Sequence, residues 1–454
     1  MVQRALLFFA LSATVSLCAE PNLIRDPDFR AVADKGAQSW KTWAPRPEIA
    51  AKGEVIASAG GNLLAMRGEN FGSYGKWITT VRNINPGQHY SFEILRKASG
   101  VQKEEVSVGV ILSWCKDEEG ATPIQRDYVD RIAEAGEWRR EFRVLQAPQA
   151  ARSVTVELFL RWTAGSVLWK SPRLLPVAAP KPRVVRVATT HLIPGPPNTL
   201  ESNMSAIRGM IERAAAEKPD VVLLSETVVD RLLDMPLTKR AQPIPGPLTA
   251  MLSELARRHR AYIVTTLEEV DAGLVYNTAV LIDRQGRIAG KYRKVHLPTM
   301  EAEDGVTPGS DYPVFDTDFG RVGILTCWDN WFIEPARILR LKGAEILFFP
   351  IMGDEPAHWD LMSRARAVDN GVFIVSSNTV GNTASRIIDP SGEVLAEASG
   401  PAGLAVKDLD LDKQWRTMWL SVGPSYGEGK SLYIKERRPD TYGVFTGDAH
   451  SRSR

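Results

Sequence analysis

The stretch Val221-Val222-Leu223-Leu224-Ser225-Glu226 places four aliphatic residues directly before two polar ones. An apolar run of this length is typical of a strand that is buried on both faces of a sheet. Comparable runs occur at Val184–Thr189 and Val322–Thr326. Between Val184–Thr189 and Val221–Glu226, the segment Asn198–Glu217 has apolar residues at helical spacing. Strands that alternate with helices predict an α/β domain over residues 184–454, with a sheet covered by helices.

Upstream of this domain the pattern is one of strands without long helices. The segments Val106–Trp114 and Ser153–Leu160 alternate with a period of two residues, and turn sequences such as Asn85-Pro86-Gly87 separate such segments. An antiparallel β-sandwich over residues 20–175 is therefore predicted. Three prolines within residues 176–183 predict a stiff interdomain linker.

Composition narrows the class of protein. The chain has 454 residues, of which 44% are hydrophobic, which is enough for two sizeable cores. Lys and Arg total 56 against 54 Asp and Glu, so the strong basic excess of a nucleic-acid-binding protein is absent. Only three cysteines are present, which excludes a disulfide scaffold. No transmembrane segment is expected beyond the extreme N-terminus, because no run of about twenty apolar residues follows it.

The N-terminus has the pattern of an export signal. One arginine precedes the apolar stretch Ala5–Val15, and a small residue, Ala19, ends the segment. These features predict a signal peptide over residues 1–19 and an exported protein, periplasmic or secreted. Acylation of Cys18 would instead give a lipid-anchored protein, but the bulky Leu17 disfavours that alternative.

Three polar residues that can perform chemistry follow apolar runs in the second half of the chain. They are Glu226, Lys294 and Cys327, and each lies at the expected end of a strand, where open α/β sheets build their sites. The spacing and the words around these residues resemble the carbon–nitrogen hydrolase, or nitrilase, superfamily over about residues 184–442. The supporting words are Tyr276-Asn277-Thr278, Pro308-Gly309, Arg364–Asn370, Ser377-Asn378 and Arg437–Tyr442.

The resemblance implies a four-layer α-β-β-α sandwich and a Glu–Lys–Cys catalytic triad formed by these three residues. It also implies a second glutamate between the lysine and the cysteine. Glu303 fits the spacing to Gly309 better than Glu301 does, and both stay candidates.

The chemistry of C–N bond hydrolysis needs these residue types. An amide carbon is a poor electrophile, so attack by a cysteine splits one difficult step into two easier ones. Glu226 is the expected general base, and a nearby base and cation are expected to favour the Cys327 thiolate. Lys294 and the backbone N–H of Trp328 are expected to stabilise the oxyanion. No step needs a metal or another cofactor, and the scattered His191, His296 and His358 are interpreted as structural.

The residues after the nucleophile refine the expected reaction. Cys327-Trp328-Asp329 resembles amidases and N-carbamoyl amine hydrolases, whereas the nitrilase branch more often has Glu at the third position. We therefore expect a small, polar, amide-type substrate, with the loop Thr227–Pro247 and the segment Gly353–Pro356 lining its pocket. The alternatives are nitrile hydrolysis by the same triad and a catalytically inactive protein that binds glycan or cell wall.

The first half resembles the jelly roll of a carbohydrate-binding module. The resemblance rests on Asn22–Phe29, Asn85–Tyr90, Gly136–Trp138 and Gly165–Trp169. It implies a possible glycan contact, since exposed aromatic rings stack on sugars. The other interpretation is that the tryptophans form the sandwich core; these are Trp40, Trp43, Trp77, Trp114, Trp138 and Trp162. The hydrolase resemblance further implies a possible homodimer, and Cys115 and Cys327 are expected to be free thiols.

Overall fold

The computed structural model describes residues 21–30 and 40–443, and the chain divides into two compact units. The first unit runs to Ala179, and the second begins at Pro180 and also takes in Gln125–Tyr128. The predicted signal peptide, with Cys18, lies outside the described residues.

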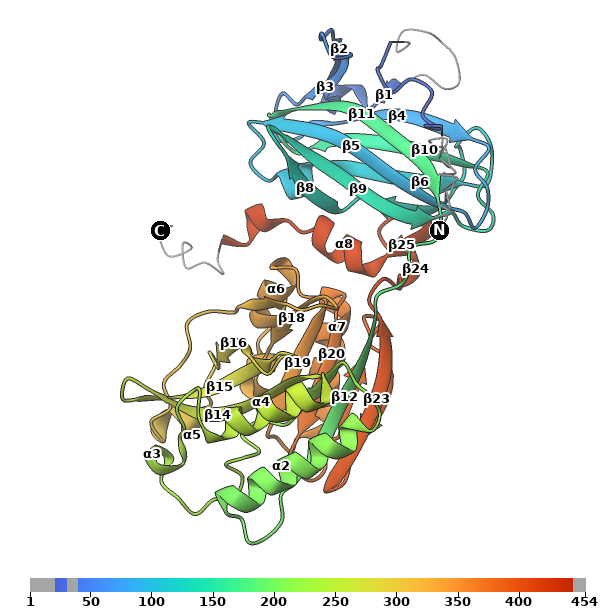
Figure 1. The fold of residues 1–454 in the computed structure, drawn as a ribbon. Helices are drawn as coiled ribbons and strands as arrows, with labels where there is room; N and C mark the ends of the chain where they lie inside the picture. The colour runs from blue at the N-terminus through green and yellow to red at the C-terminus, as the bar shows by residue number, and fades with distance from the viewer. Residues whose placement is uncertain (1–20, 31–39, 444–454) are drawn as a thin grey trace, which may run out of the picture. The chain divides into compact units, whose positions relative to one another are not determined.

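The N-terminal unit is built from short antiparallel strands, drawn in blue to green in Figure 1. One sheet contains strands in the order β1-β4-β10-β6, and the other has the order β2-β3-β11-β5-β9-β8. The strands are β1 (Lys41–Trp43), β2 (Lys52–Ile56), β3 (Leu63–Arg67), β4 (Tyr74–Arg82), β5 (His89–Ser99), β6 (Val108–Cys115), β7 (Pro123–Tyr128), β8 (Arg131–Ala135), β9 (Trp138–Gln146), β10 (Ser153–Arg161) and β11 (Ser166–Val177). Two short helices, η1 (Pro47–Ile49) and α1 (Glu104–Ser107), accompany them.

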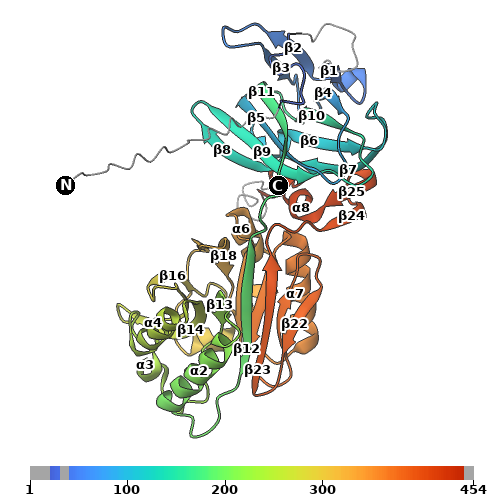
Figure 2. The ribbon, with the colours of Figure 1, turned by 45° about the vertical axis from the view of Figure 1, so that its right-hand side comes forward.

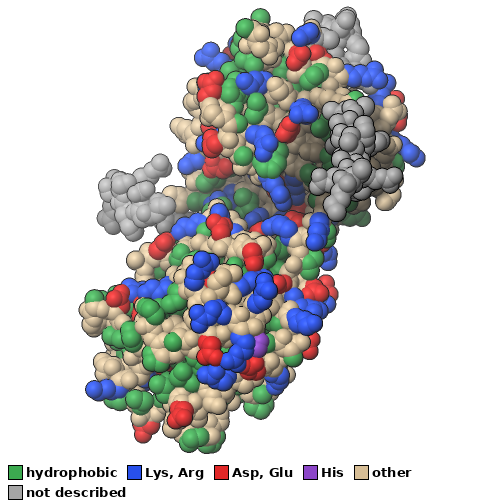
Figure 3. All heavy atoms as spheres, viewed as in Figure 1, with side chains coloured by type: hydrophobic (Ala, Val, Ile, Leu, Met, Phe, Trp, Pro, Cys, Tyr) green, Lys and Arg blue, Asp and Glu red, His purple; other side chains and the backbone are tan. Residues whose placement is uncertain are grey.

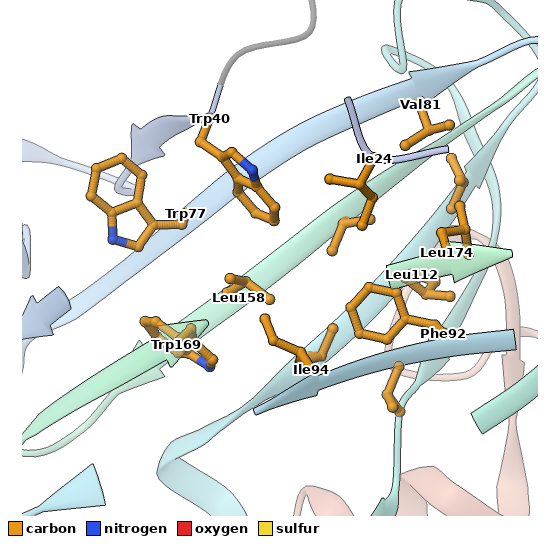
Figure 4. Packing of buried hydrophobic residues seen from close by; sticks show 14 of the residues in the cluster. Ile24, Trp40, Trp77, Val81, Phe92, Ile94, Leu112, Leu158, Trp169 and Leu174 are labelled. Carbon is orange, nitrogen blue, oxygen red and sulfur yellow. The ribbon is translucent and has the colours of Figure 1, made fainter. Parts of the chain in front are cut away.

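A single apolar core lies between these two sheets, because alternate residues of each strand point inward (Figure 4). Trp40, Trp77 and Trp114 are buried in this core, as one interpretation of the sequence predicted. Trp43 is not part of the core: its side chain is 42% exposed, since β1 is an edge strand and its residues are all exposed. The two-sheet arrangement is that of a β-sandwich, whereas a jelly-roll relationship stays a prediction.

The second unit contains alternating strands and helices, as the sequence predicted. Its strands are β12 (Val184–Leu192), β13 (Val221–Leu223), β14 (Tyr262–Asp271), β15 (Leu274–Ile282), β16 (Ile288–Arg293), β17 (Val314–Asp316), β18 (Arg321–Ile324), β19 (Ile346–Ile351), β20 (Phe373–Asn378), β21 (Ser385–Ile388), β22 (Val394–Ala398), β23 (Ala402–Asp410), β24 (Arg416–Trp419) and β25 (Gly423–Glu428). Its helices are α2 (Leu200–Ala215), α3 (Leu237–Arg240), α4 (Pro247–His259), α5 (Thr299–Glu303), η2 (Cys327–Trp331), α6 (Glu334–Leu341), α7 (Pro356–Asn370), α8 (Gly429–Lys435) and η3 (Pro439–Thr441).

Three apolar clusters define the layers of this unit. The central cluster joins inward residues of β12–β16 to those of β18–β20, such as Val264 and Phe348. The opposite face of β13–β15 packs on α2 and α4, which lie side by side in Figures 1 and 2. The opposite face of β19 and β20 packs on α6 and α7. The layer order is therefore helix, strand, strand, helix, with parallel pairing between β12, β13 and β14 and between β18, β19 and β20.

The surface has no single dominant charge on the face shown in Figure 3, where basic and acidic side chains are intermixed. Among the described residues, no helix combines the length and the apolar character needed to cross a bilayer.

Candidate active site

Glu226 lies just beyond the end of β13, where the backbone turns sharply. Thr227, the next residue, has a φ of 40°, and its N–H donates to Oγ1 of Thr266 at 2.7 Å. A β-branched residue in the left-handed region is strained by about 1–3 kcal/mol. This turn leaves the Glu226 side chain buried, with 1% of its surface exposed.

Lys294 directly follows β16, and its backbone is held on both sides. Its N–H donates to the carbonyl of Asn277 at 2.9 Å, and its carbonyl accepts from the N–H of Gly309 at 2.8 Å. A Cβ at position 309 would lie 2.1 Å from the carbonyl oxygen of Arg293, so only glycine fits there. The close approach of the Gly309 backbone holds Lys294 at a position where no part of the Lys294 side chain is exposed.

The ammonium group of Lys294 sits between two carboxylates. Its Nζ lies 3.0 Å from Oε1 of Glu226 and 2.6 Å from Oε1 of Glu301. The contact of Lys294 is thus with Glu301 and not with Glu303, the residue that the sequence spacing favoured. Residues 301 and 303 are two positions apart on α5, so their side chains point about 160° apart around the helix axis, and Glu303 is exposed.

Cys327 begins the short helix η2 and is also in the left-handed region, with a φ of 44°. Its side chain is 7% exposed, and its Sγ lies 3.8 Å from the carbonyl oxygen of Met352. Gly353, which follows Met352, is held by the side chain of Asn378. The Asn378 amide accepts from the N–H of Gly353 at 3.2 Å and donates to the carbonyl of Gly353 at 2.8 Å. Trp328 occupies the first turn of η2, where a backbone N–H has no acceptor within the helix.

The Glu226 carboxylate raises the pKa of both Cys327 and Lys294, which favours the neutral thiol and the charged lysine. Burial raises the pKa of the Cys327 thiol well above its ordinary value, and the Glu226 carboxylate raises it further, although Lys294 lowers it. This direction is opposite to the favoured thiolate that the sequence predicted. Burial lowers the pKa of Lys294, but Glu226, Cys327 and Glu301 together raise it above the ordinary value, so the lysine is a cation.

Asp329 connects the cysteine turn to the lysine segment. This fully buried carboxylate accepts from the N–H of Thr326 at 3.0 Å and from the N–H of His296 at 3.0 Å. It also accepts from the hydroxyl of Tyr292 at 2.5 Å, which is one of the reasons that the pKa of Tyr292 is raised, burial being the largest. Residues 292 and 296 flank Lys294, so one carboxylate fixes both reactive segments.

Replacing Asp329 with Ala should therefore lower both stability and activity. Three donors lose their acceptor, two of them buried, and each buried unsatisfied donor costs about 1–3 kcal/mol. Chemical denaturation should show the loss, and kcat/KM should fall at least about tenfold as the two segments separate. Asp329→Asn, which keeps one acceptor oxygen, should fall between the two proteins. An Asp329→Ala protein with unchanged stability and activity would contradict this role.

Part of the predicted pocket lining is occupied by internal contacts. Arg240 forms two hydrogen bonds with the Glu268 carboxylate, so its charge is already paired. Asp230 is buried, and burial together with the charge of Glu268 raises its pKa to about 8. Among the described residues, no group of three or more His, Cys, Asp and Glu side chains could hold a metal ion. Cys115 and Cys327 are both free thiols, as expected.

The model of the carbon-nitrogen hydrolase family matches residues 186–416. The omega-amidase NIT2 of Homo sapiens is 32% identical over 231 residues, which cover 46% of this chain and 84% of that protein. A probable nitrilase of Schizosaccharomyces pombe is 32% identical over 205 residues, covering 43% of this chain and 74% of that one.

Solved structures give matches of similar extent. Nit3 of Saccharomyces cerevisiae, a member of branch 10 of the nitrilase superfamily, has 28% identity and a TM-score of 0.47, covering 51% of this chain and 93% of that one. An amidase from Nesterenkonia sp. has 22% identity and a TM-score of 0.48, covering 59% of this chain and 98% of that one.

The chain belongs to the carbon-nitrogen hydrolase family, since the family model covers half of its length. It is a hydrolase of carbon–nitrogen bonds other than peptide bonds. The resemblance predicted from the sequence words is thereby confirmed for the second half of the chain.

Proposed function

We propose that the protein is an amidase that works through a thioester on Cys327. The observation that carries the proposal is the buried Lys294 ammonium, held at 3.0 and 2.6 Å between the carboxylates of Glu226 and Glu301. Two of its three N–H bonds are thereby used, and the third has no partner in the described part of the chain, which leaves it for a substrate oxygen. Similarity to omega-amidase NIT2 supports an amide substrate.

In the proposed first half-reaction, Glu226 takes the thiol proton as Sγ of Cys327 bonds to the amide carbon. The carbonyl π electrons move to oxygen, and Lys294 and the N–H of Trp328 stabilise the resulting oxyanion. The oxyanion then collapses, the C–N bond breaks, and Glu226 protonates the departing nitrogen. A thioester remains on the enzyme, and ammonia or an amine leaves.

In the second half-reaction, Glu226 removes a proton from water as the water oxygen attacks the thioester carbon. The C–S bond breaks, the sulfur regains the proton from Glu226, and a carboxylic acid is released. Glu301 keeps Lys294 in place throughout, because the lysine would otherwise be free to pair with Glu226 alone. Burial and the Glu226 charge raise the pKa of the Cys327 thiol, so the thiol needs Glu226 as a base to take its proton.

A substrate panel tests this assignment. Primary amides, N-carbamoyl amines and nitriles of matched side chain should be compared for ammonia release by the purified protein. We expect turnover of the amides, with Cys327→Ala inactive and Cys115→Ser fully active. Nitrile turnover exceeding amide turnover would replace the proposal with nitrile hydrolysis. No turnover of any of the three would favour a protein that only binds glycan or cell wall.

We also propose that the N-terminal unit contacts glycan. The exposed ring of Trp43 meets Tyr74 edge to face at 5.8 Å, and the Lys76 ammonium lies 4.7 Å from the Trp43 ring centre. An exposed aromatic ring that packs on a half-buried one beside a polar group is suited to the apolar face of a sugar. Retention on insoluble polysaccharide should fall in Trp43→Ala and stay unchanged in Trp419→Ala, which removes an exposed ring of the second unit. Equal retention of both variants and the parent protein would contradict the contact.

Export is proposed on the N-terminal sequence alone. Expression in a bacterium with a secretory pathway should give a mature protein that starts near Glu20 and lies outside the cytoplasm. An intact N-terminus on the purified protein would contradict this proposal.

A further inference from the structure

The two oxygens of the Glu226 carboxylate have different surroundings. Oε1 accepts two hydrogen bonds, from Nζ of Lys294 at 3.0 Å and from Nδ2 of Asn277 at 2.8 Å. Oε2 is buried and has no hydrogen-bond partner within residues 21–30 and 40–443. A buried carboxylate oxygen without a partner is costly, so its retention calls for an explanation.

Asn277 reaches three of the groups that surround the nucleophile. Its side chain donates to Glu226, and its hydrogen bond to Glu301 lowers the pKa of that residue against the larger effect of burial. Its backbone carbonyl accepts from the N–H of Lys294 at 2.9 Å. The residue lies on β15 and is 4% exposed, so its amide is held in a single place by the sheet.

We infer that Asn277 is a positioning residue that, together with Lys294, occupies Oε1 of Glu226 and so leaves Oε2 as the oxygen that takes the thiol proton. The inference rests on the proposed function. With Oε1 filled by two donors, the carboxylate is prevented from rotating, and one oxygen is presented to the sulfur. During attack the proton passes from Sγ of Cys327 to Oε2 while the S–C bond forms.

The amide is suited to this task because it is neutral. A second cation at position 277 would compete with Lys294 for the carboxylate, whereas an acid there would repel Glu226 and Glu301. The charged groups that face Glu226 are then Lys294, Glu301 and, once ionised, Cys327. Asn277 adds a donor without altering the net charge of this set.

Two substitutions separate positioning from space filling. Asn277→Asp keeps the shape of the side chain but replaces the donor with a carboxylate, and Asn277→Ala removes the side chain. We expect kcat on the best amide to fall about ten- to hundredfold in the Ala protein, the equivalent of a hydrogen bond to a charged group, with KM little changed. The Asp protein should fall at least as far at neutral pH.

The pH profile adds a readout that a structural role would not move. The hydrogen bond from Asn277 lowers the pKa of Glu301, so its loss in the Ala protein should move the acid limb of kcat/KM to higher pH. The control is Asn370→Ala, which removes an equally buried amide that donates to the carbonyl of Arg366. That control should lose stability without a shift of the acid limb.

The inference is overturned if Asn277→Asp stays within about twofold of the parent protein across the pH range, since shape alone would then suffice. It is also overturned if both Asn277 variants lose activity only in proportion to the unfolded fraction. Either result leaves the proposed function standing as long as Cys327→Ala is inactive. Activity in Cys327→Ala would instead remove the proposed function itself.

Discussion

Replacing Lys294 with Met should lower kcat/KM by at least about a hundredfold, because the oxyanion loses its charged donor. The structure adds a second expected effect. Lys294 is the cation between two carboxylates, and Met leaves the buried Glu226 carboxylate without its cation next to the half-buried Glu301. Breaking a buried ion pair by removing one partner costs about 3–5 kcal/mol, so the free energy of unfolding should fall as well.

A double variant separates these two effects. Lys294→Met combined with Glu301→Gln removes one of the two uncompensated charges, so it should regain part of the lost stability while staying inactive. Thermal denaturation and steady-state kinetics on the same preparations give both quantities. A Lys294→Met protein with near-normal kcat/KM would exclude Lys294 from the mechanism.

Replacing Glu226 with Gln should have opposite effects on amide turnover and on alkylation of the thiol. Turnover should fall by about 10²–10⁴, because the general base is lost. The charge that raises the pKa of Cys327 is lost as well, while Lys294, which lowers that pKa, remains. More thiolate is then present at neutral pH, and iodoacetamide should alkylate Cys327 faster than in the parent protein.

The pH dependence of alkylation checks the sign of this effect. In the parent protein, the alkylation rate of Cys327 should keep rising at pH values above those of an ordinary thiol, because the pKa is raised. In Glu226→Gln the same rise should occur at lower pH. Cys115 is fully buried, so alkylation of Cys115 would report unfolding of the protein and not the state of the site. Slower alkylation of the Glu226→Gln protein at neutral pH would contradict the resting state described for this site.

The positions of Glu226 and Cys327 could be predicted because each follows an apolar run, whereas Lys294 follows the partly exposed antiparallel strand β16 and was found from the family resemblance of the words around it. Such a run defines a buried strand, and the carboxyl ends of neighbouring parallel strands meet at one edge of the sheet. The α/β class follows from the same pattern, since alternating periods of strand and helix admit few other architectures.

The choice between Glu301 and Glu303 could not be made in this way. It depends on the phase of a five-residue helix, and linear spacing to Gly309 carries no information on that phase. The contacts of Asn277 and Asp329 were missed for a related reason. Both residues belong to sequence words that resemble the family, but their partners lie on other elements. Asn277 contacts Glu226, which is 51 residues away in the chain, and Asp329 contacts Tyr292, which is 37 residues away.

The direction of the pKa shift of the Cys327 thiol could not be predicted from the sequence either. A nearby base and a nearby cation act on the thiol in opposite directions, and burial decides the balance. Burial is a property of the packed core around Leu325 and Phe349, and the residues beside the cysteine in the chain do not define it. Likewise, Trp40 is buried whereas Trp43, on the edge strand β1, is exposed, and the sequence did not predict this difference in burial.

Trapping the covalent intermediate tests the central claim most directly. The protein should be mixed with its best amide substrate, quenched in acid within the first turnovers, digested and examined by mass spectrometry. We predict the mass of the acyl group on the peptide that contains Cys327, in the parent protein and in Cys115→Ser, and in neither case on Cys115. Cys327→Ala should show no adduct and release no ammonia. Ammonia release by Cys327→Ala, or an acyl group bound only elsewhere, would contradict the thioester mechanism.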